Sequence, residues 1–308
     1  MTTLLVSQPN FADHLTPPGH PERADRIRAV NDVLTSPQFD TLLRRDAPYG
    51  DLNLVELVHH PDYLAALRDA RPAEGMRQLD GDTYISGKSL DVVAAGLGGA
   101  LSALDAVVLG EVDNAFCAIR PPGHHAEIEM PMGFCLINTI AITAREAQRK
   151  YGADRIAIVD FDVHHGNGTQ DIFKDDPSVF YASSHQMPLF PGTGNPSETG
   201  VGNIFNAALR EGSGGAEMRE AYRDIILPAL DNFAPDLLLI SAGFDAHHLD
   251  PLAQLEWQDE DFAWVTAKLM DVAGKRCANR IVSLLEGGYD LKGLSGGVAH
   301  HVTTLLNG

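Results

Sequence analysis

The sequence predicts an α/β fold in which a central, mostly parallel sheet is flanked by helices on both faces. Near-continuous hydrophobic runs rich in β-forming residues recur along the chain, and amphipathic helical stretches lie between most of them. Polar segments follow these runs directly, at the carboxyl ends of the expected strands, where open α/β sheets bind ligands. Because the 308 residues contain no linker, low-complexity tract or internal repeat, we expect one domain over 1–308.

Five hydrophobic runs define the expected strands: NAFCAI (114–119), RIAIVDF (155–161), SVFYAS (178–183), DLLLISA (236–242) and IVSLLE (281–286). The polar segments that follow them, in order, are RPPGHHAE, DFDVHHGNG, SSHQ, GFDAHH and EGGYD. Amphipathic patterns predict helices at 89–108, 133–150, 217–233 and 260–275, and one more after the segment HPERADRIRAV. None of the apolar segments is expected to reach the length needed to span a bilayer.

The charge balance argues against nucleic acid as a partner. The chain has 23 Lys and Arg against 42 Asp and Glu, a formal net charge of −19, and no basic stripe. Such a surface repels a phosphate backbone and is compatible with cationic small molecules or lysine-rich peptides. Solubility alone also explains an acidic surface, so the charge does not identify a ligand.

The N-terminus and the cysteines predict the compartment. The segment MTTLLVSQPNF lacks the basic region and the long apolar run of a secretory signal. The cysteines, Cys117, Cys135 and Cys277, have no close-paired spacing, which argues against a disulfide framework and against a thiolate zinc site. We therefore expect a cytoplasmic protein without a membrane partner.

The segment IAIVDFDVHHGNGTQ (156–170) ends an apolar run with closely spaced aspartates and histidines. In an extended conformation Asp160, Asp162 and His164 point the same way, and two carboxylates would repel each other unless a cation lay between them. Asp245, at another strand end, completes with Asp162 and His164 a three-ligand set that leaves one position open, as in catalytic zinc sites. An Asp-x-His pair alone fits a helix cap and a loop histidine equally well, and Asp245 makes a metal the better interpretation.

A metal-activated water also requires a base and a polarised substrate carbonyl. The GHH segment supplies His124 and His125, and Asp160 is placed to orient one imidazole through a hydrogen bond. Tyr289 follows two glycines, whose backbone freedom lets a phenol reach a developing oxyanion. The alternatives are a surface histidine pair in a turn and a buried core tyrosine.

Together, the segments RPPGHHAE, GFCLIN, DFDVHHGNGTQ, PGTG, SAGFDAH and EGGYD resemble the histone deacetylase and acetylpolyamine amidohydrolase superfamily. The resemblance runs from HPER at 20 to the last expected helix, and is closest to class II deacetylases and bacterial histone deacetylase-like amidohydrolases. It implies an arginase/deacetylase-like fold and one zinc-dependent deacetylase domain over 1–308. The implied reaction is hydrolysis of a linear amide, such as an acetylated lysine side chain or another small acylated amine.

Carried over residue by residue, the resemblance implies a zinc ion on Asp162, His164 and Asp245. It implies His125 as the general base and His124 as its electrostatic partner, with His124 hydrogen-bonded to Asp160. Tyr289 would polarise the amide carbonyl.

One position departs from class I deacetylases and agrees with class II. Asn167 stands where class I has an aspartate behind the second histidine. An amide orients His125 without adding charge, so we expect His125 to be neutral at the working pH.

The resemblance further implies a substrate tunnel and structural cations. Gly133, Phe134 and Phe190 would wall an acyl-lysine tunnel, and Leu252 would lie at its rim. An inner potassium or sodium ion near the zinc would be bound by Asp160, Asp162, His164, Ser183 and Ser184. An outer potassium site would involve Phe173, Asp176 and Val179. The fourth residue of that site cannot be matched to a position in this sequence.

One rival function is rejected and a second is less favoured. Arginases share the fold and bind two manganese ions, but the positions of their extra carboxylates are Gly166 and Gly243 here, and glycine has no side-chain ligand. An inactive zinc-dependent module that only binds acetylated ligands ranks behind an enzyme, because Tyr289, His124 and His125 are all present.

The substrate is less constrained. The net charge of −19 favours acetylated polyamines as the alternative. Leu252 is apolar, and the segment 66–90 is too short for a long dimerising insertion, so we favour acyl-lysine side chains or other small amides. The sequence leaves open whether the chain forms a homo-oligomer.

Overall fold

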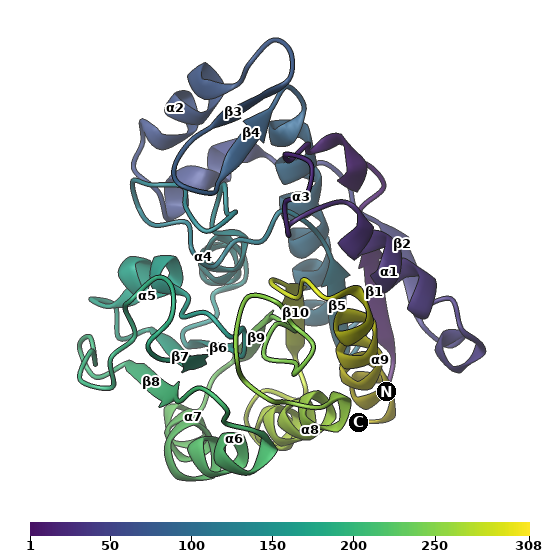
Figure 1. The fold of residues 1–308 in the computed structure, drawn as a ribbon. Helices are drawn as coiled ribbons and strands as arrows, with labels where there is room; N and C mark the ends of the chain where they lie inside the picture. The colour runs from purple at the N-terminus through teal and green to yellow at the C-terminus, as the bar shows by residue number, and fades with distance from the viewer.

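The computed structural model describes residues 1–308 and contains an eight-stranded sheet in which every strand pair is parallel (Figure 1). The strand order is β2-β1-β5-β10-β9-β6-β7-β8. The strands are β1 (Thr3–Ser7), β2 (Leu43–Asp46), β5 (Asn114–Ala118), β6 (Ile156–Asp160), β7 (Val179–Gln186), β8 (Ile204–Leu209), β9 (Leu237–Ala242) and β10 (Ile281–Leu285). A separate antiparallel hairpin pairs β3 (Met76–Gln78) with β4 (Tyr84–Ser86).

Helices cover both faces of the sheet, which confirms the predicted fold class (Figure 1). On one face lie α2 (Tyr63–Ala70), α3 (Ser89–Val108) and α4 (Thr139–Tyr151). On the other face lie α1 (Asp25–Val33), α6 (Gly215–Ala221), α7 (Leu227–Phe233), α8 (Asp259–Arg276) and α9 (Leu291–Asn307). Strand residues alternate between two apolar cores, as β6 shows with Ile158 in one core and Val159 in the other.

The strand predictions hold for all five runs, and three strands of the sheet were missed. β2 and β8 are the edge strands, and polar residues interrupt their apolar pattern, as in LRRD and IFNAAL. β1 has only the brief apolar run LLV. The SSHQ segment belongs to β7 itself, which extends to Gln186, and does not follow the strand as expected.

Three helix predictions need correction. The helix expected at 133–150 begins at Thr139, because the Asn138 side chain caps it by accepting the N–H of Ala141 at 3.1 Å. The helix expected after HPERADRIRAV begins inside that segment, at Asp25. The helix expected at 217–233 is interrupted by a π-helical turn at Tyr222–Ile226. The turn ends two residues before Pro228, which lacks the N–H that a regular helix needs.

Helix α3 is long and apolar enough to cross a membrane by length and composition, contrary to the expectation from the sequence. In the fold, 72% of its apolar window is buried. The helix packs against β1, β5 and β10 and beside α4, and its apolar character is that of a core helix.

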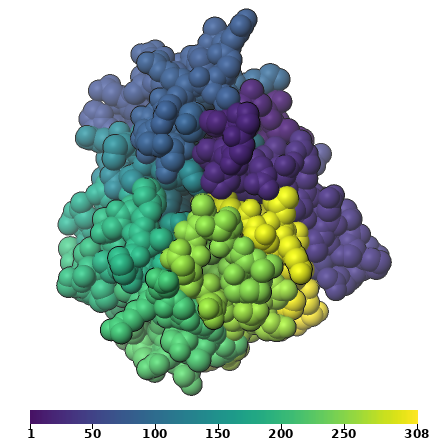
Figure 2. Space-filling model, viewed as in Figure 1, coloured from purple at the N-terminus to yellow at the C-terminus, as the bar shows by residue number.

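The strand order brings distant segments of the chain to one edge of the sheet. β5, β10, β9 and β6 are consecutive neighbours, so the loops that follow these four strands lie next to one another. Their carboxyl ends carry the GHH, EGGY, GFDAHH and DVHH segments. Figure 2 shows the N-terminal third meeting the C-terminal segments across the middle of one face of the molecule.

Candidate active site

Asp162, His164 and Asp245 converge as predicted. Their ligand atoms all lie within 4.8 Å of one another, and all three residues are buried. β6 ends at Asp160, so Asp162 and His164 lie in the turn that follows, not in an extended strand. Asp160 does not point the same way as these ligands: its carboxylate accepts hydrogen bonds from the Tyr181 hydroxyl at 3.0 Å and, as expected, from His124 Nδ1 at 2.9 Å.

Two carboxylates in this cluster share one imidazole. His164 Nδ1 lies 3.1 Å from Asp162 Oδ1 and 3.2 Å from Asp245 Oδ2, and Asp245 Oδ2 is buried without a hydrogen bond. Burial and the neighbouring Asp162 raise the pKa of Asp245 to about 7. Burial opposes the charged form of His164, but both carboxylates raise its pKa to about 10. The oxygen and nitrogen donors, together with the unpartnered oxygen, fit a divalent cation in this position.

The hydrogen-bond network fixes the tautomer of His125. His125 Nδ1 lies 2.7 Å from Asn167 Oδ1, while Asn167 Nδ2 donates to the carboxylate of Glu127 at 2.6 Å. Because Glu127 accepts the amide N–H, the amide oxygen must face His125, and Nδ1 must carry the proton. His125 Nε2 is therefore left with a lone pair. Burial, with the adjacent His124 and His164, lowers the pKa of His125 well below its usual value, in line with the expected neutral base.

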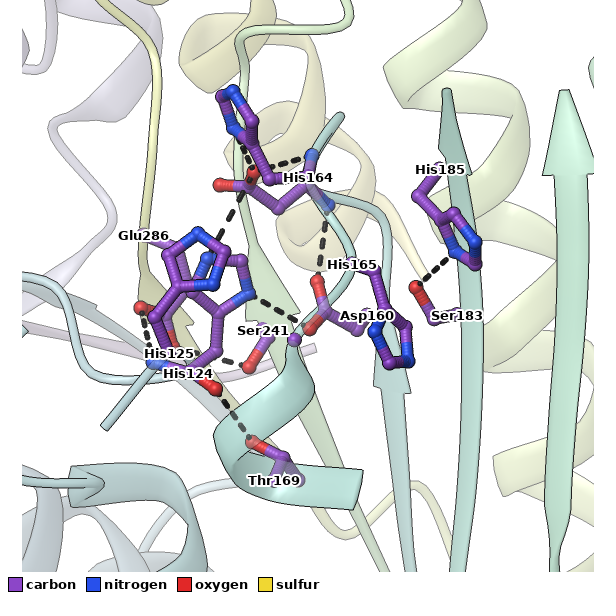
Figure 3. A network of polar contacts seen from close by, with 12 residues as sticks. His124, His125, Asp160, His164, His165, Thr169, Ser183, His185, Ser241 and Glu286 are labelled. Carbon is purple, nitrogen blue, oxygen red and sulfur yellow. Dashed lines mark hydrogen bonds and ion pairs between the residues drawn. The ribbon is translucent and has the colours of Figure 1, made fainter. Parts of the chain in front are cut away.

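His124 lies in a different electrostatic environment from its neighbour. The two rings stand side by side with centroids 4.0 Å apart, next to Asp160 and Glu286 (Figure 3). Burial opposes the charged form of His124, but Asp160 and Asp162 raise its pKa to about 10. The pKa values of these adjacent histidines therefore shift in opposite directions: His124 favours the protonated imidazolium, and His125 favours the neutral imidazole.

Glu286 is a buried carboxylate that the sequence reasoning did not assign. It accepts the backbone N–H of Gly123 at 2.6 Å and of His124 at 3.2 Å, and the hydroxyl of Ser241 at 3.0 Å. Burial raises its pKa to about 7, against the opposing charge of His124. Its position at the end of the apolar run IVSLLE was the feature of the sequence that could have indicated its role.

A pocket of about 240 Å³ opens above this cluster, and it brings together all the predicted substrate-binding residues. Its lining consists of Asp82, His125, Gly133, Phe134, His164, Leu189, Phe190, Leu252 and Tyr289. Gly133 has φ +55°, and a side chain there would overlap the imidazole of His125. Asp82 and Leu189 were missed, because they lie in loops without a recognisable motif. A larger hollow of about 510 Å³ beside α8 and the C-terminus has no histidine in its lining.

Hydrogen bonds from Arg26, a residue of α1, hold the loop that carries Tyr289. Arg26 Nε donates to the carbonyl of Gly288 at 2.6 Å, and its Nη2 donates to the carbonyl of Glu286. The guanidinium lies 4.9 Å from the centroid of the Tyr289 ring. Burial raises the pKa of the Tyr289 phenol well above its usual value, so the hydroxyl keeps its proton. Arg26, in α1, thereby positions a hydroxyl donor in the pocket wall.

The predicted inner cation residues also lie together. Asp160 pairs in register with Ser183, the Ser183 hydroxyl contacts His185 Nδ1 at 2.9 Å, and the Ser184 hydroxyl contacts the Tyr222 hydroxyl at 3.1 Å. The main-chain carbonyls of Asp162 and His164 accept no hydrogen bond from the backbone.

The predicted outer cation residues also lie together, but their carbonyl oxygens face a side chain of the protein. The main-chain carbonyl oxygens of Phe173, Asp176 and Val179 lie within 3.0 Å of one side-chain nitrogen, Nδ2 of Asn203, whose two hydrogens are shared among them.

Comparison with known proteins agrees with this geometry. Residues 20–305 match the family described as "Histone deacetylase domain". The chain is 40% identical over 301 residues to "Histone deacetylase 10, chloroplastic" of Oryza sativa subsp. japonica, covering 91% of this chain and 68% of that protein. It is 37% identical over 292 residues to "Histone deacetylase-like amidohydrolase" of Pseudomonas aeruginosa, covering 92% of this chain and 74% of that protein.

A solved structure, "Crystal Structure of HDA15 HD domain", superposes with a TM-score of 0.93 and 32% sequence identity. The match covers 100% of this chain and 89% of that one. The chain therefore belongs to the histone deacetylase family of amide hydrolases.

Proposed function

We propose that this protein is a zinc-dependent deacetylase that removes acetyl or other small acyl groups from lysine-like amines. The observation that carries the proposal is the convergence of Asp162, His164 and Asp245 within 4.8 Å, with His164, His125 and Tyr289 lining one pocket. A metal-ligand set, a neutral imidazole and a protonated phenol are the groups that amide hydrolysis by activated water requires.

Asp162, His164 and Asp245 would hold the zinc ion, and the unpartnered Asp245 Oδ2 supports this assignment. When bound, zinc would lower the pKa of a water molecule and polarise the substrate carbonyl. For the inner potassium or sodium ion we propose Asp160, Asp162, His164, Ser183 and Ser184, and the free carbonyls of Asp162 and His164 support that set.

His125 would accept the proton of the attacking water at Nε2, since Asn167 occupies Nδ1. The charged His124 beside it opposes protonation of His125 in the resting state, which keeps the base available. The Tyr289 hydroxyl would donate a hydrogen bond to the amide oxygen as negative charge develops there. The histidine pair would then return a proton to the departing amine, giving the free amine and acetate.

For the substrate we infer an acyl-lysine side chain, with acetylated polyamines as the second candidate. Phe134 and Phe190 provide apolar walls for an aliphatic chain, and Leu252 adds an apolar rim. Asp82 lines the same pocket and offers a carboxylate to a substrate N–H or ammonium group. Asp82 weakens the argument from Leu252 against cationic amines. A module that only binds acetylated ligands ranks third, because His125 and Tyr289 both line the pocket.

The test is kcat/KM of the zinc-loaded protein on an acetyl-lysine peptide, N-acetylspermidine and N-acetylputrescine. We expect turnover of the peptide, and a loss of about 10²- to 10³-fold in Tyr289→Phe with unchanged zinc content, since one oxyanion donor is removed. A higher kcat/KM for the acetylated polyamines would identify them as the preferred substrate class. Bound zinc without turnover of any substrate would contradict an enzymatic function.

A further inference from the structure

Asn203, directly before β8, places its side-chain nitrogen among three main-chain carbonyl oxygens. Asn203 Nδ2 lies 2.8 Å from the carbonyl oxygen of Phe173, 3.0 Å from that of Asp176 and 2.8 Å from that of Val179. The side chain is buried, with an exposed fraction of 5% for the residue. These three carbonyls are the ones for which an outer cation was expected.

The orientation of this amide is fixed by its surroundings. Asn203 Oδ1 accepts the backbone N–H of Val201 at 3.2 Å, so the oxygen must face Val201 and the NH₂ group must face the carbonyls. The reverse orientation would place an oxygen against three oxygens. The Asn203 main chain is also anchored, because its carbonyl accepts the N–H of Tyr181 at 3.0 Å.

The charge of this turn is balanced without an ion. Its carboxylate nearest the carbonyls, Asp176, is paired with Arg145 and also accepts the N–H and hydroxyl of Ser178 at 2.9 Å and 2.7 Å. The Arg145 guanidinium lies 4.7 Å from the centroid of the Phe173 ring. The Asp176 carboxylate is thus neutralised within the protein, so it leaves no unbalanced negative charge that would attract a cation to this turn.

An ion that coordinated the same three oxygens would overlap Asn203 Nδ2. We propose that in this protein the Asn203 amide replaces the outer monovalent cation. The turn 174–178 joins α5 (Asn167–Phe173), whose first residue holds His125, to β7, so the amide fixes the connection between two parts of the active site. Because the amide is part of the chain, this connection does not depend on the potassium or sodium concentration.

Rubidium anomalous diffraction from crystals of the full chain tests the proposal directly. In the unmodified protein we expect no rubidium peak among the carbonyls of Phe173, Asp176 and Val179. In Asn203→Ala, which removes the amide and leaves the carbonyls, we expect a peak at that position. A rubidium peak there in the unmodified protein, with the Asn203 side chain rotated away, would overturn the proposal without the need for any variant.

Thermal unfolding provides a second readout in solution. We compare Tm in potassium chloride with Tm in choline chloride at the same ionic strength. The potassium-dependent gain of Asn203→Ala should exceed that of the unmodified protein by about 2 °C or more, since the emptied carbonyls gain an ion. The comparison is between variants, so any potassium effect at the inner site is common to all of them.

Asn206→Ala is the matched control. Asn206 is a neighbouring buried amide whose Nδ2 donates to Gln170 Oε1 at 2.7 Å and to the carbonyl of Glu198 at 3.2 Å. Its loss should lower Tm while leaving the potassium-dependent gain equal to that of the unmodified protein. An equal gain in Asn203→Ala and Asn206→Ala would show that Asn203 is an ordinary buried amide, and would contradict the proposal.

Discussion

His125 Nδ1 lies 2.7 Å from Asn167 Oδ1, and this contact determines which imidazole nitrogen is free for chemistry. Asn167 is itself oriented by Glu127, which accepts its NH₂ group at 2.6 Å. An amide in this position directs the ring as a carboxylate would, but adds no charge that would stabilise the protonated imidazole.

Replacing Asn167 by aspartate should therefore make His125 more basic. The variant is best built as Asn167→Asp with Glu127→Gln, because two carboxylates would otherwise meet where Asn167 now donates to Glu127. In the proposed mechanism the reaction begins with neutral His125, so a higher pKa of His125 moves the acidic limb of the kcat/KM profile to higher pH by about one unit or more. Glu127→Gln alone is the control. An acidic limb that stays in place in the double variant would show that His125 does not act as the base.

Glu286→Gln should separate the charge of Glu286 from its hydrogen bonds. The glutamine oxygen can still accept the N–H groups of Gly123 and His124, and its NH₂ group can donate to Ser241. Losing the negative charge makes protonated His124 less stable, so we expect kcat to fall about 10-fold with KM and Tm nearly unchanged.

Glu286→Leu is the contrasting variant, since it removes charge and acceptors together. It should also lower Tm, because two buried backbone N–H groups lose their partner. Equal kcat in Glu286→Gln and the unmodified protein would show that the carboxylate serves only to hold the loop.

Zinc should stabilise the protein more strongly as the pH rises. In the metal-free protein the pKa of Asp245 is raised from 3.8 to about 7, and that of His164 from 6.5 to about 10. The folded state therefore binds more protons than the unfolded state, and these two groups make stability fall as pH rises from about 4 to about 10. Zinc displaces those protons, so the zinc-induced gain in Tm should increase between pH 5 and pH 9, roughly the range in which both groups titrate.

The measurement is Tm of metal-free and zinc-loaded protein across that pH range, with Asp245→Asn as the control that binds zinc weakly. A zinc-induced gain that is independent of pH would contradict the assignment of Asp245 and His164 as ligands.

Asp82→Asn should distinguish cationic from neutral substrates. Asp82 lines the pocket, and burial together with the nearby Asp80 raises its pKa. If its charge contacts a second amine, KM for N-acetylspermidine should rise about 10-fold while KM for neutral N-acetylbutylamine stays nearly constant. Equal changes in KM for both substrates would mean that Asp82 affects the shape of the pocket and does not bind the substrate's positive charge.

The sequence alone determined the fold class and predicted the candidate reacting groups. Five hydrophobic runs followed by polar segments predicted the parallel sheet and its functional edge, because ligands bind at the carboxyl ends of parallel strands. Asp162, His164 and Asp245 were predicted to be metal ligands, because carboxylates gathered at strand ends repel each other unless a cation lies between them. Phe134, Phe190 and Leu252 were placed by resemblance, and the structure gathers them around one pocket.

Only the tertiary structure decided which groups support this chemistry. No local sequence signal marks Asp82, Arg26 or Asn203, because their partners lie on segments far away in the sequence. The outer cation site illustrates the reason. Phe173, Asp176 and Val179 contribute main-chain carbonyls, which every residue has, so the sequence cannot show what faces them. The packing of β8 beside β7 brings the Asn203 amide to those carbonyls, and this long-range contact determines whether an amide or an ion binds them.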